Sequence, residues 1–337
     1  MISGPSPSLE NGAMTTDKMT RREFVQRTTA GAAAMAIAGP SLAAGVSMPE
    51  RGLGRTGHQV RLFSLGGQAT LERQGTHDQS LAIINRAIDL GVNYIDTAAR
   101  YGQGISQTYI GEVMATRRRE VFLASKTHDR TRDGSLKLLD ESLRLLQTDH
   151  LDLWQLHNVR TDEEVDQIFA KGGAIEALTQ ARDQKMIRFI GITGHFDPDV
   201  LARALGRFDF DTILMALNAA DRHRLSFIDR LLPVAAGKHM GIIGMKIPAR
   251  GRLIRPGGVA SMKDAMHYVL SLPVSTVIVG CDTVEQLEEN VRLATTFEPL
   301  APADMARLEG LTAGYEAEAT WFKSGGAGFT RPGDDDQ

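Results

Sequence analysis

The chain has 337 residues, of which 42% are hydrophobic and 23% are charged, so it is long and apolar enough to fold around a sizeable core. Its 38 basic and 41 acidic residues give a formal net charge of −3, which argues against nucleic acid or an anionic membrane surface as a general partner. The single cysteine, Cys281, excludes an internal disulfide and any cluster that several thiolates hold.

Residues 1–47 differ in composition from the rest of the chain and resemble a signal peptide followed by a linker. A polar stretch contains the paired arginines Arg21 and Arg22, and a short run of Ala, Gly and Met follows over residues 28–38. That run is shorter than the roughly 20 residues of a membrane-spanning helix, and a small-x-small pattern follows it, as expected for cleavage near Ala43. The paired arginines resemble the twin-arginine signal, so we expect export to the periplasm by the twin-arginine machinery, without a stable membrane anchor after cleavage. The alternative is an ordinary disordered tail.

From Arg51 onward, short runs of Val, Ile and Leu alternate with longer stretches of helical period, as in parallel strands joined by helices. The predicted strands are 62–65, 93–96, 121–125, 151–156, 189–192, 212–216, 241–245 and 276–279. The predicted helices are 77–90, 106–115, 134–146, 173–185, 198–205, 226–238, 262–270 and 284–294. Eight such units predict a single-domain α/β fold of the closed (β/α)₈ TIM-barrel type, because a doubly wound sheet usually stops at about six strands.

Shorter segments flank this barrel, which we place at residues 48–300. Residues 51–60 predict a β-hairpin that caps the bottom of the barrel. Residues 301–323 predict a C-terminal helix, and the Gly-rich and then acidic residues 324–337 predict a flexible tail. Residues 159–171 are expected to form a long loop after the fourth strand.

That loop and the C-terminal aromatic residues Trp321, Phe322 and Phe329 are expected to select a small-molecule substrate. An equal alternative is that Trp321 and Phe322 pack a terminal helix.

Ionisable side chains follow three successive predicted strands, at the end of a barrel where active sites are built. Asp96 ends the second strand, and Tyr101 follows in its loop; Lys126 ends the third strand, and His157 follows the fourth. Each residue alone has a structural interpretation, but an acid, a phenol, an amine and an imidazole at one rim indicate chemistry. A lysine cation favours tyrosinate, so we expect Lys126 to lower the pKa of Tyr101 toward that of a working proton donor. Asp96 would keep Lys126 charged, and His157 would direct a substrate oxygen.

At these residues the chain resembles the aldo-keto reductase family. The stretch GVNYIDTAARYG over 91–102, FLASK ending at Lys126 and LDLWQLH ending at His157 reproduce the family's Asp, Tyr, Lys and His tetrad in order. The strings QLHNVRTDEE and GITGH are similar to the predicted-oxidoreductase branch of the family. The resemblance implies hydride transfer between a nicotinamide cofactor and a small carbonyl, alcohol or sugar-like substrate, with Tyr101 as general acid.

The resemblance also implies cofactor contacts beyond the later strands. They fall on Thr193, Asn218, Met245, Lys246, Arg250, Gly280, Cys281, Asp282, Gln286, Glu289 and Asn290. Several positions depart from the family's pattern: Gly194 stands for an asparagine, Leu214 for a glutamine, Met245 for a stacking tyrosine and Gln286 for an arginine.

These departures leave two questions open. We expect NADP as cofactor. NAD is the alternative, because Asp282 would repel a 2′-phosphate but accept a hydrogen bond from a free ribose hydroxyl. The second function class is a non-catalytic small-molecule binding protein on the same barrel, which the altered cofactor contacts favour and the complete tetrad opposes. No metal site is expected, because no known metal-ligand spacing occurs.

Overall fold

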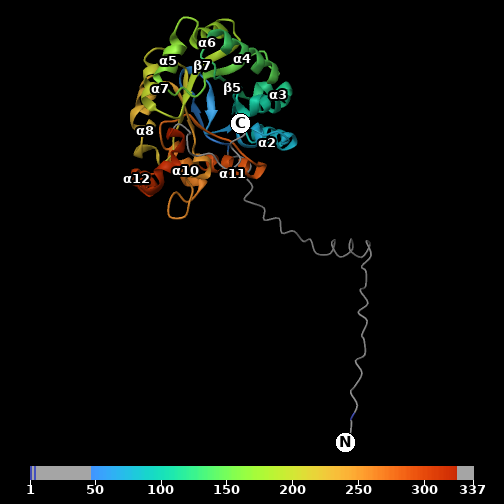
Figure 1. The fold of residues 1–337 in the computed structure, drawn as a ribbon, viewed down its shortest axis with the longest axis vertical. Helices are drawn as coiled ribbons and strands as arrows, with labels where there is room; N and C mark the ends of the chain where they lie inside the picture. The colour runs from blue at the N-terminus through green and yellow to red at the C-terminus, as the bar shows by residue number, and fades with distance from the viewer. Residues whose placement is uncertain (2–3, 5–46, 325–337) are drawn as a thin grey trace. The chain divides into compact units, whose positions relative to one another are not determined.

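The computed structural model describes residues 47–324, together with Met1 and Gly4 (Figure 1). The predicted twin-arginine segment and the predicted tail beyond Ser324, with Phe329, lie outside these residues. Eight parallel strands close into a barrel in the order β10-β3-β4-β5-β6-β7-β8-β9. The strands are β3 (Phe63–Gly66), β4 (Tyr94–Asp96), β5 (Phe122–Thr127), β6 (Leu151–Leu156), β7 (Ile187–Gly194), β8 (Thr212–Ala216), β9 (Gly241–Met245) and β10 (Thr276–Val279). The predicted fold class is confirmed.

Helices surround the strands in a ring (Figure 1). They are α2 (His77–Asp89), α3 (Ile105–Arg117), α4 (Arg132–Leu145), α5 (Asp162–Phe169), α6 (Ala174–Asp183), α7 (Pro198–Leu205), α8 (Phe227–Arg230), α9 (Leu232–Gly237), α10 (Met262–Leu270), α11 (Val284–Thr295), α12 (Pro302–Thr312) and α13 (Glu316–Ala319). Short 3₁₀ turns add η1 (Gly54–Thr56), η2 (Ala69–Glu72), η3 (Tyr101–Gly104), η4 (Arg118–Glu120), η5 (Asp221–His223), η6 (Ala249–Gly251), η7 (Ala313–Tyr315) and η8 (Trp321–Ser324).

The expected long loop over residues 159–171 is wrong, because α5 occupies most of it. Thr161 accepts a hydrogen bond from the Glu164 N–H at 3.2 Å, and the Glu164 carboxylate accepts one from the Arg160 N–H at 2.6 Å. These contacts satisfy N–H groups at the helix start, and Val165 and Ile168 bury its apolar face. The segment is therefore fixed by capping and packing.

Two other predicted helices are divided. The helix expected over 226–238 is interrupted at Leu231, because Pro233 in the first turn of α9 has no N–H to continue the ladder. The segment expected as one C-terminal helix consists of α12, η7, α13 and η8, so the chain turns several times there.

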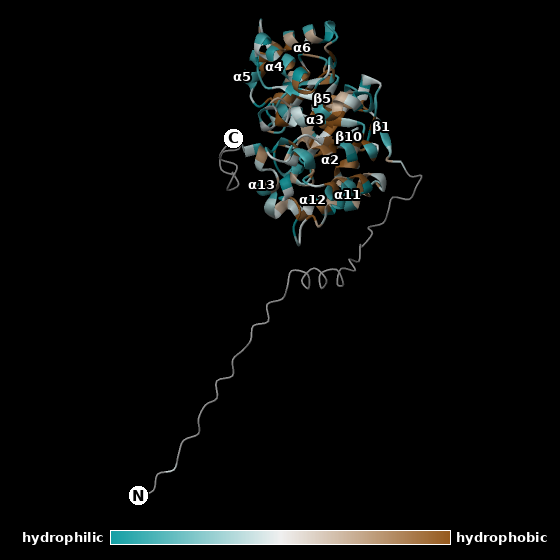
Figure 2. Ribbon diagram, turned by 90° about the vertical axis from the view of Figure 1, so that its right-hand side faces the viewer, coloured by the Kyte–Doolittle hydropathy of each residue, from teal (hydrophilic) through white to brown (hydrophobic). Residues whose placement is uncertain are grey.

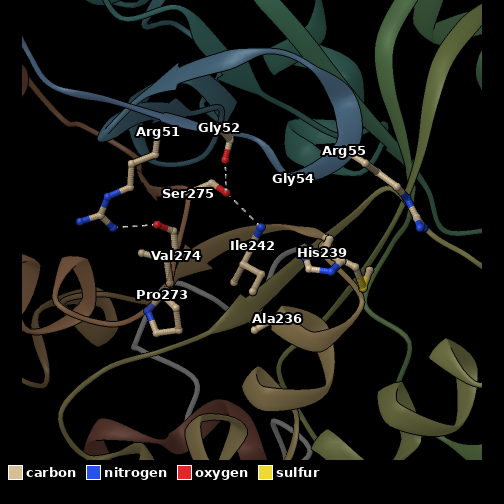
Figure 3. A pocket seen from close by; sticks show the side chains of 11 residues that line it. Arg51, Gly52, Gly54, Arg55, Ala236, His239, Ile242, Pro273, Val274 and Ser275 are labelled. Atoms are coloured by element: carbon tan, nitrogen blue, oxygen red, sulfur yellow. Dashed lines mark hydrogen bonds between the residues drawn. The ribbon is translucent and has the colours of Figure 1, made fainter.

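The predicted hairpin closes the N-terminal end of the barrel. Its strands β1 (Glu50–Gly52) and β2 (Gln59–Arg61) pair antiparallel. Figure 3 shows the pocket of about 440 Å³ that it borders. There Arg51 donates to the Val274 carbonyl at 2.7 Å, and the Ser275 hydroxyl donates to the Gly52 carbonyl at 2.9 Å. These contacts join the hairpin to the chain entering β10.

The barrel interior above the hairpin is apolar, and Figure 2 shows hydrophobic segments concentrated around β10 inside a more hydrophilic surface. The buried cluster contains Leu53, Val60, Tyr94, Phe122, Ala124, Leu153, Leu214, Ile243 and Ile278. Alternate residues of a strand face the same side, so the positions that follow these toward the carboxyl ends also face inward. None of the helices in residues 47–324 has the length and apolar composition of a membrane span.

Candidate active site

A cavity of about 1360 Å³ opens at the carboxyl ends of the strands. Its walls come from the loops after β3, β4, β9 and β10, together with Trp321 near the end of the described chain. The predicted residues Asp96 and Tyr101 line it. The mouth of the barrel therefore holds the larger of the two pockets described here, at the end where TIM barrels carry their chemistry.

Strand alternation places the tetrad above the apolar core. Asp96 lies two residues after the core residue Tyr94 on β4, and Lys126 lies two residues after Ala124 on β5. Asp96 pairs with Ala124 in the β4–β5 register, so Lys126 lies one inward-facing position further along the neighbouring strand, from which its long side chain reaches Asp96. The barrel thus explains why residues 30 positions apart in the chain meet.

Lys126 is the centre of a buried polar network. Its ammonium group contacts the Asp96 carboxylate, donates to the Thr97 carbonyl at 2.8 Å and donates to the Tyr101 hydroxyl at 3.2 Å. The side chains of Lys126 and Asp96 are 1% and 3% exposed, so the ammonium finds its partners within the protein. An ammonium has three donors, and these contacts use all of them.

Tyr101 is held by a tight turn. Gly102, Gln103 and Gly104 follow it with φ of 56°, 52° and 97°, in the left-handed region that glycine adopts without strain. A Cβ at Gly102 would lie 2.1 Å from the carbonyl oxygen of Glu72. Glycine is therefore required there to bring Tyr101 against the loop after β3.

Burial and charge act in opposite directions on the tetrad. Burial raises the pKa of Tyr101, and the Lys126 ammonium opposes this without overcoming it, so the net pKa lies above the ordinary value. Lys126 has the lowering effect expected from the sequence, but the burial of the phenol outweighs it. Burial alone would lower the pKa of Lys126, but the Asp96 carboxylate and Tyr101 raise it overall. At neutral pH the phenol carries its proton, and the lysine is charged.

His157 lies beside Tyr101, with ring centroids 5.7 Å apart in an edge-to-face arrangement. Burial lowers its pKa well below the ordinary value, and the charge of Lys126 adds to this effect. His157 is consequently neutral at physiological pH. Its Nδ1 has no hydrogen-bond partner among the described residues.

Gln155 completes the network, although the sequence analysis did not single it out. Its amide donates to the second Asp96 oxygen at 3.0 Å, and its side chain is buried. It lies two residues after Leu153 and two before His157, so strand alternation places it on the inner face. The signal in the sequence was a polar amide at a strand position that faces the inside of the barrel.

Most of the residues expected to hold a cofactor line the cavity. These are Met245, Lys246, Arg250, Gly280, Asp282, Gln286, Glu289 and Asn290. They belong to the end of β9 and its loop, and to the loop after β10 and the first half of α11.

Three expected cofactor residues do not line the cavity, and their polar groups contact protein. Thr193 accepts a hydrogen bond from the Asn158 N–H at 2.8 Å. Asn218 donates to the Ala319 carbonyl at 3.2 Å and to the Lys246 carbonyl at 3.3 Å. Cys281 is fully buried, and burial raises the pKa of its thiol to about 12. These contacts support the loops around the cavity.

Asp282 connects the loops after β3 and β10. Its carboxylate forms an ion pair with Arg73 at 3.2 Å, and its backbone carbonyl accepts hydrogen bonds from Thr70 at 3.0 Å and Gln79 at 2.7 Å. The negative charge of Asp282 therefore has a cation beside it, which the sequence pattern did not reveal. In residues 47–324 no group of three or more His, Cys, Asp and Glu side chains is arranged to hold a metal ion.

Comparison with known proteins agrees with this architecture. The sequence profile of the aldo/keto reductase family matches residues 63–257. The uncharacterized oxidoreductase YqkF of Bacillus subtilis (strain 168) is 28% identical over 291 residues, covering 73% of this chain and 91% of that protein. L-galactose dehydrogenase of Arabidopsis thaliana is 28% identical over 289 residues, covering 74% of this chain and 89% of that enzyme.

The fold also matches solved structures. An aldo-keto reductase from Klebsiella pneumoniae in complex with NADPH superposes with a TM-score of 0.67 at 22% identity, covering 79% of this chain and 96% of that one. The family profile extends over more than half of the chain, and similar proteins over most of their length are named oxidoreductases. The chain therefore belongs to the aldo/keto reductase family and is an oxidoreductase.

Proposed function

We propose that this enzyme transfers hydride between a nicotinamide cofactor and a small carbonyl, alcohol or sugar-like substrate, with the Tyr101 hydroxyl as general acid. The observation that carries the proposal is the 3.2 Å contact between the Lys126 ammonium and the Tyr101 hydroxyl at the cavity wall. A donor that is itself held by Asp96 can stabilise the negative charge that appears on the phenol oxygen when the proton leaves.

The geometry favours proton donation by Tyr101 during carbonyl reduction. Burial raises its pKa, so the phenol is protonated before the reaction. Lys126 offsets part of the cost of losing that proton, because the tyrosinate would lie beside a cation whose own carboxylate partner is fixed by Gln155. In the direction of alcohol oxidation, the same oxygen would take the proton back.

His157 would orient the substrate oxygen. Its neutral imidazole next to Tyr101 can donate one N–H to a carbonyl oxygen without adding a second charge to the site. This role requires that the ring stay neutral, as its burial and its cationic neighbours ensure.

The cavity fits a nicotinamide cofactor. Lys246, Arg250 and Arg252 on its wall provide positive charge for the phosphates, and α11, which begins at Val284 after its cap Thr283, starts beside it. The indole N–H of Trp321 has no acceptor among the described residues, and a ligand oxygen would supply one. When bound, the cofactor supplies or accepts the hydride; the residues named here bind and orient it.

We favour NADP over NAD. Two features of the sequence argue against NADP: the charge of Asp282, and Gln286 in the place of an arginine. The ion pair with Arg73 reduces the first objection. Titration of the purified protein with NADPH and with NADH, followed by intrinsic fluorescence, tests the choice. Binding of NADPH at least about tenfold tighter than NADH supports it, and the reverse order contradicts it.

The substrate class is tested with aldoses. L-galactose dehydrogenase, one of the similar proteins, is named for a sugar, and the cavity offers polar side chains and enough room to take one. Reduction of small aldehydes or aldoses by wild-type protein, lost in Tyr101→Phe with cofactor binding retained, supports the function. Wild-type protein that binds neither cofactor would leave the alternative of a non-catalytic binding protein.

The export of the protein is a separate proposal, supported by the paired arginines and the cleavage pattern near Ala43. Mass spectrometry of periplasmic protein tests it. A mature chain that begins close to residue 44 supports twin-arginine export, and an intact N-terminus in the cytoplasmic fraction contradicts it.

A further inference from the structure

The last described segment, Glu316–Ser324, connects two loops at the mouth of the barrel and is termed here the C-terminal strap. Glu318 pairs with Arg255 in the loop after β9, at 2.6 Å. Asn218, in the loop after β8, donates to the Ala319 carbonyl at 3.2 Å. An ion pair and a hydrogen bond thus join the strap to the loops after the neighbouring strands β9 and β8.

A buried ion pair fixes the end of the strap. Lys323 is 0% exposed and Asp221 is 2% exposed, and their charged atoms are 2.6 Å apart. The Lys323 ammonium also donates to the Leu225 carbonyl at 3.0 Å, and the other Asp221 oxygen accepts from the Ile228 N–H at 2.9 Å. Breaking such a pair would leave an uncompensated buried charge, so the strap has one strongly preferred position.

In this position the strap places Trp321 against three cations of the loop after β9. The distances to the indole ring centroid are 5.9 Å from the Lys246 ammonium, 5.6 Å from the Arg250 guanidinium and 5.0 Å from the Arg252 guanidinium. All three lie within the range in which a ring face attracts a cation. Trp321 and the three cations line the cavity together.

The charges of Lys246 and Arg250, two of these cations, act on each other at the cavity wall. Burial and then the charge of Arg250 lower the pKa of Lys246 to about 8. The Glu72 carboxylate, which also lines the cavity, acts on the pKa of Lys246 in the opposite direction. Keeping the Lys246 ammonium charged beside Arg250 therefore costs free energy, which an aromatic face reduces and a polyanion would offset more fully.

We propose that Trp321, fixed by the strap, is a positioning residue that gathers Lys246, Arg250 and Arg252 into one cation cluster for the phosphate groups of the nicotinamide cofactor. The inference rests on the proposed function, because it names the part of the cofactor that this wall of the cavity binds.

Calorimetric titration of the purified protein with inorganic pyrophosphate and with NADP⁺ tests the proposal. Trp321→Leu should weaken both ligands about tenfold, since the cations lose the ring that gathers them. Trp321→Phe, which keeps a ring, should recover part of that loss. Phe297→Leu is the matched control: it removes the contact of Arg51 with an aromatic ring, 5.5 Å from its centroid, at the base of the barrel, and should leave both affinities unchanged.

The strap itself is tested through fluorescence, because the chain has 2 tryptophans and Trp154 is buried in β6. In a Trp154→Phe background, Lys323→Met should shift the Trp321 emission to longer wavelength and weaken pyrophosphate binding to the same degree as Trp321→Leu. The double variant Asp221→Asn with Lys323→Met removes both buried charges. If Lys323→Met alone does not fold, the same two measurements are made on the double variant.

The outcomes separate the two proposals. NADP⁺ binding that is unchanged or tighter in Trp321→Leu overturns the role of Trp321 and leaves the proposed function standing. Weaker NADP⁺ binding with unchanged pyrophosphate binding also overturns it, because the indole would then act on another part of the cofactor. If wild-type protein binds pyrophosphate but no dinucleotide, the proposed function fails, and the cluster is an anion site of another kind.

Discussion

The two ends of the barrel are built from opposite kinds of contact. At the base, the hairpin and the strand entrances exchange hydrogen bonds with backbone carbonyls, as Arg51 does with Val274, and the neighbouring barrel interior is apolar. At the mouth, ionisable side chains from separate strands and loops meet at a cavity wall, where Tyr101 lines the cavity and contacts the buried Lys126. One end of the barrel thus holds the fold together, while the other carries charge that the fold must stabilise. Substitutions at the base should therefore change stability, and substitutions at the mouth should change activity and binding.

The largest expected effect is at the mouth. Tyr101→Phe removes the proton donor and should lower kcat by about a thousandfold, in the range of general acid catalysis. The ring remains, so the unfolding temperature and the affinity for NADP⁺ should change little. Steady-state kinetics, thermal unfolding and cofactor titration of the same preparation check this. A variant that keeps wild-type turnover would remove Tyr101 from the chemistry.

The largest effect at the base is expected for Gly54→Ala. Gly54 has a φ of 52°, and a Cβ there would lie 2.1 Å from the backbone nitrogen of Gly241. The strain and overlap should cost about 3 kcal/mol of unfolding free energy. Denaturant unfolding measures it, and kcat per folded molecule should stay at the wild-type value. Gly57→Ala, which meets no atom within 4 Å, separates the strain of a positive φ from the overlap.

A smaller effect at the mouth concerns the pH dependence of cofactor binding. Burial and Arg250 lower the pKa of Lys246 to about 8, while Glu72 opposes this. An anion binds the charged form, so wild-type affinity for NADP⁺ should fall as the pH rises through this value and above it. Lys246→Gln should bind NADP⁺ about tenfold more weakly at neutral pH and lack this decline. Equal pH profiles for the two proteins would show that Lys246 does not contact the cofactor's charge.

The smallest effect is expected at the base for Arg51→Gln. Arg51 donates to the carbonyls of Val274 and Leu270 at 2.7 Å and 2.9 Å. Losing these partly buried hydrogen bonds should destabilise the fold by about 1 to 2 kcal/mol and leave KM unchanged. Chemical unfolding measures the loss of stability, and steady-state kinetics measure KM. A raised KM with unchanged stability would mean that Arg51, at the base, affects substrate binding at the mouth.

Sequence reasoning predicted the barrel and the tetrad because both depend on local regularities. Polar residues at the ends of successive apolar runs indicated Asp96 and Lys126, because parallel strands bring their carboxyl ends to one rim. Contacts between distant segments were not predictable in this way. Arg73 meets Asp282 only because the barrel closes between β3 and β10, and Lys323 meets Asp221 because the strap returns across the loop after β8.

Other omissions had a local cause. Gln155 is not predicted from the sequence, because a neutral amide in an apolar strand gives no sign of its partner. Its position between Leu153 and His157 faces inward, and there it contacts Asp96. The net pKa of Tyr101 was misjudged because burial, which a sequence does not report, outweighs the neighbouring Lys126.

A single-turnover experiment with Tyr101→Phe and wild-type protein tests whether Tyr101 donates the proton. Each is loaded with NADPH and mixed with excess aldose, and the absorbance of the reduced nicotinamide is followed. We expect wild-type protein to oxidise its bound cofactor, while Tyr101→Phe holds it reduced for about a thousandfold longer. Equal rates of oxidation in the two proteins would contradict it.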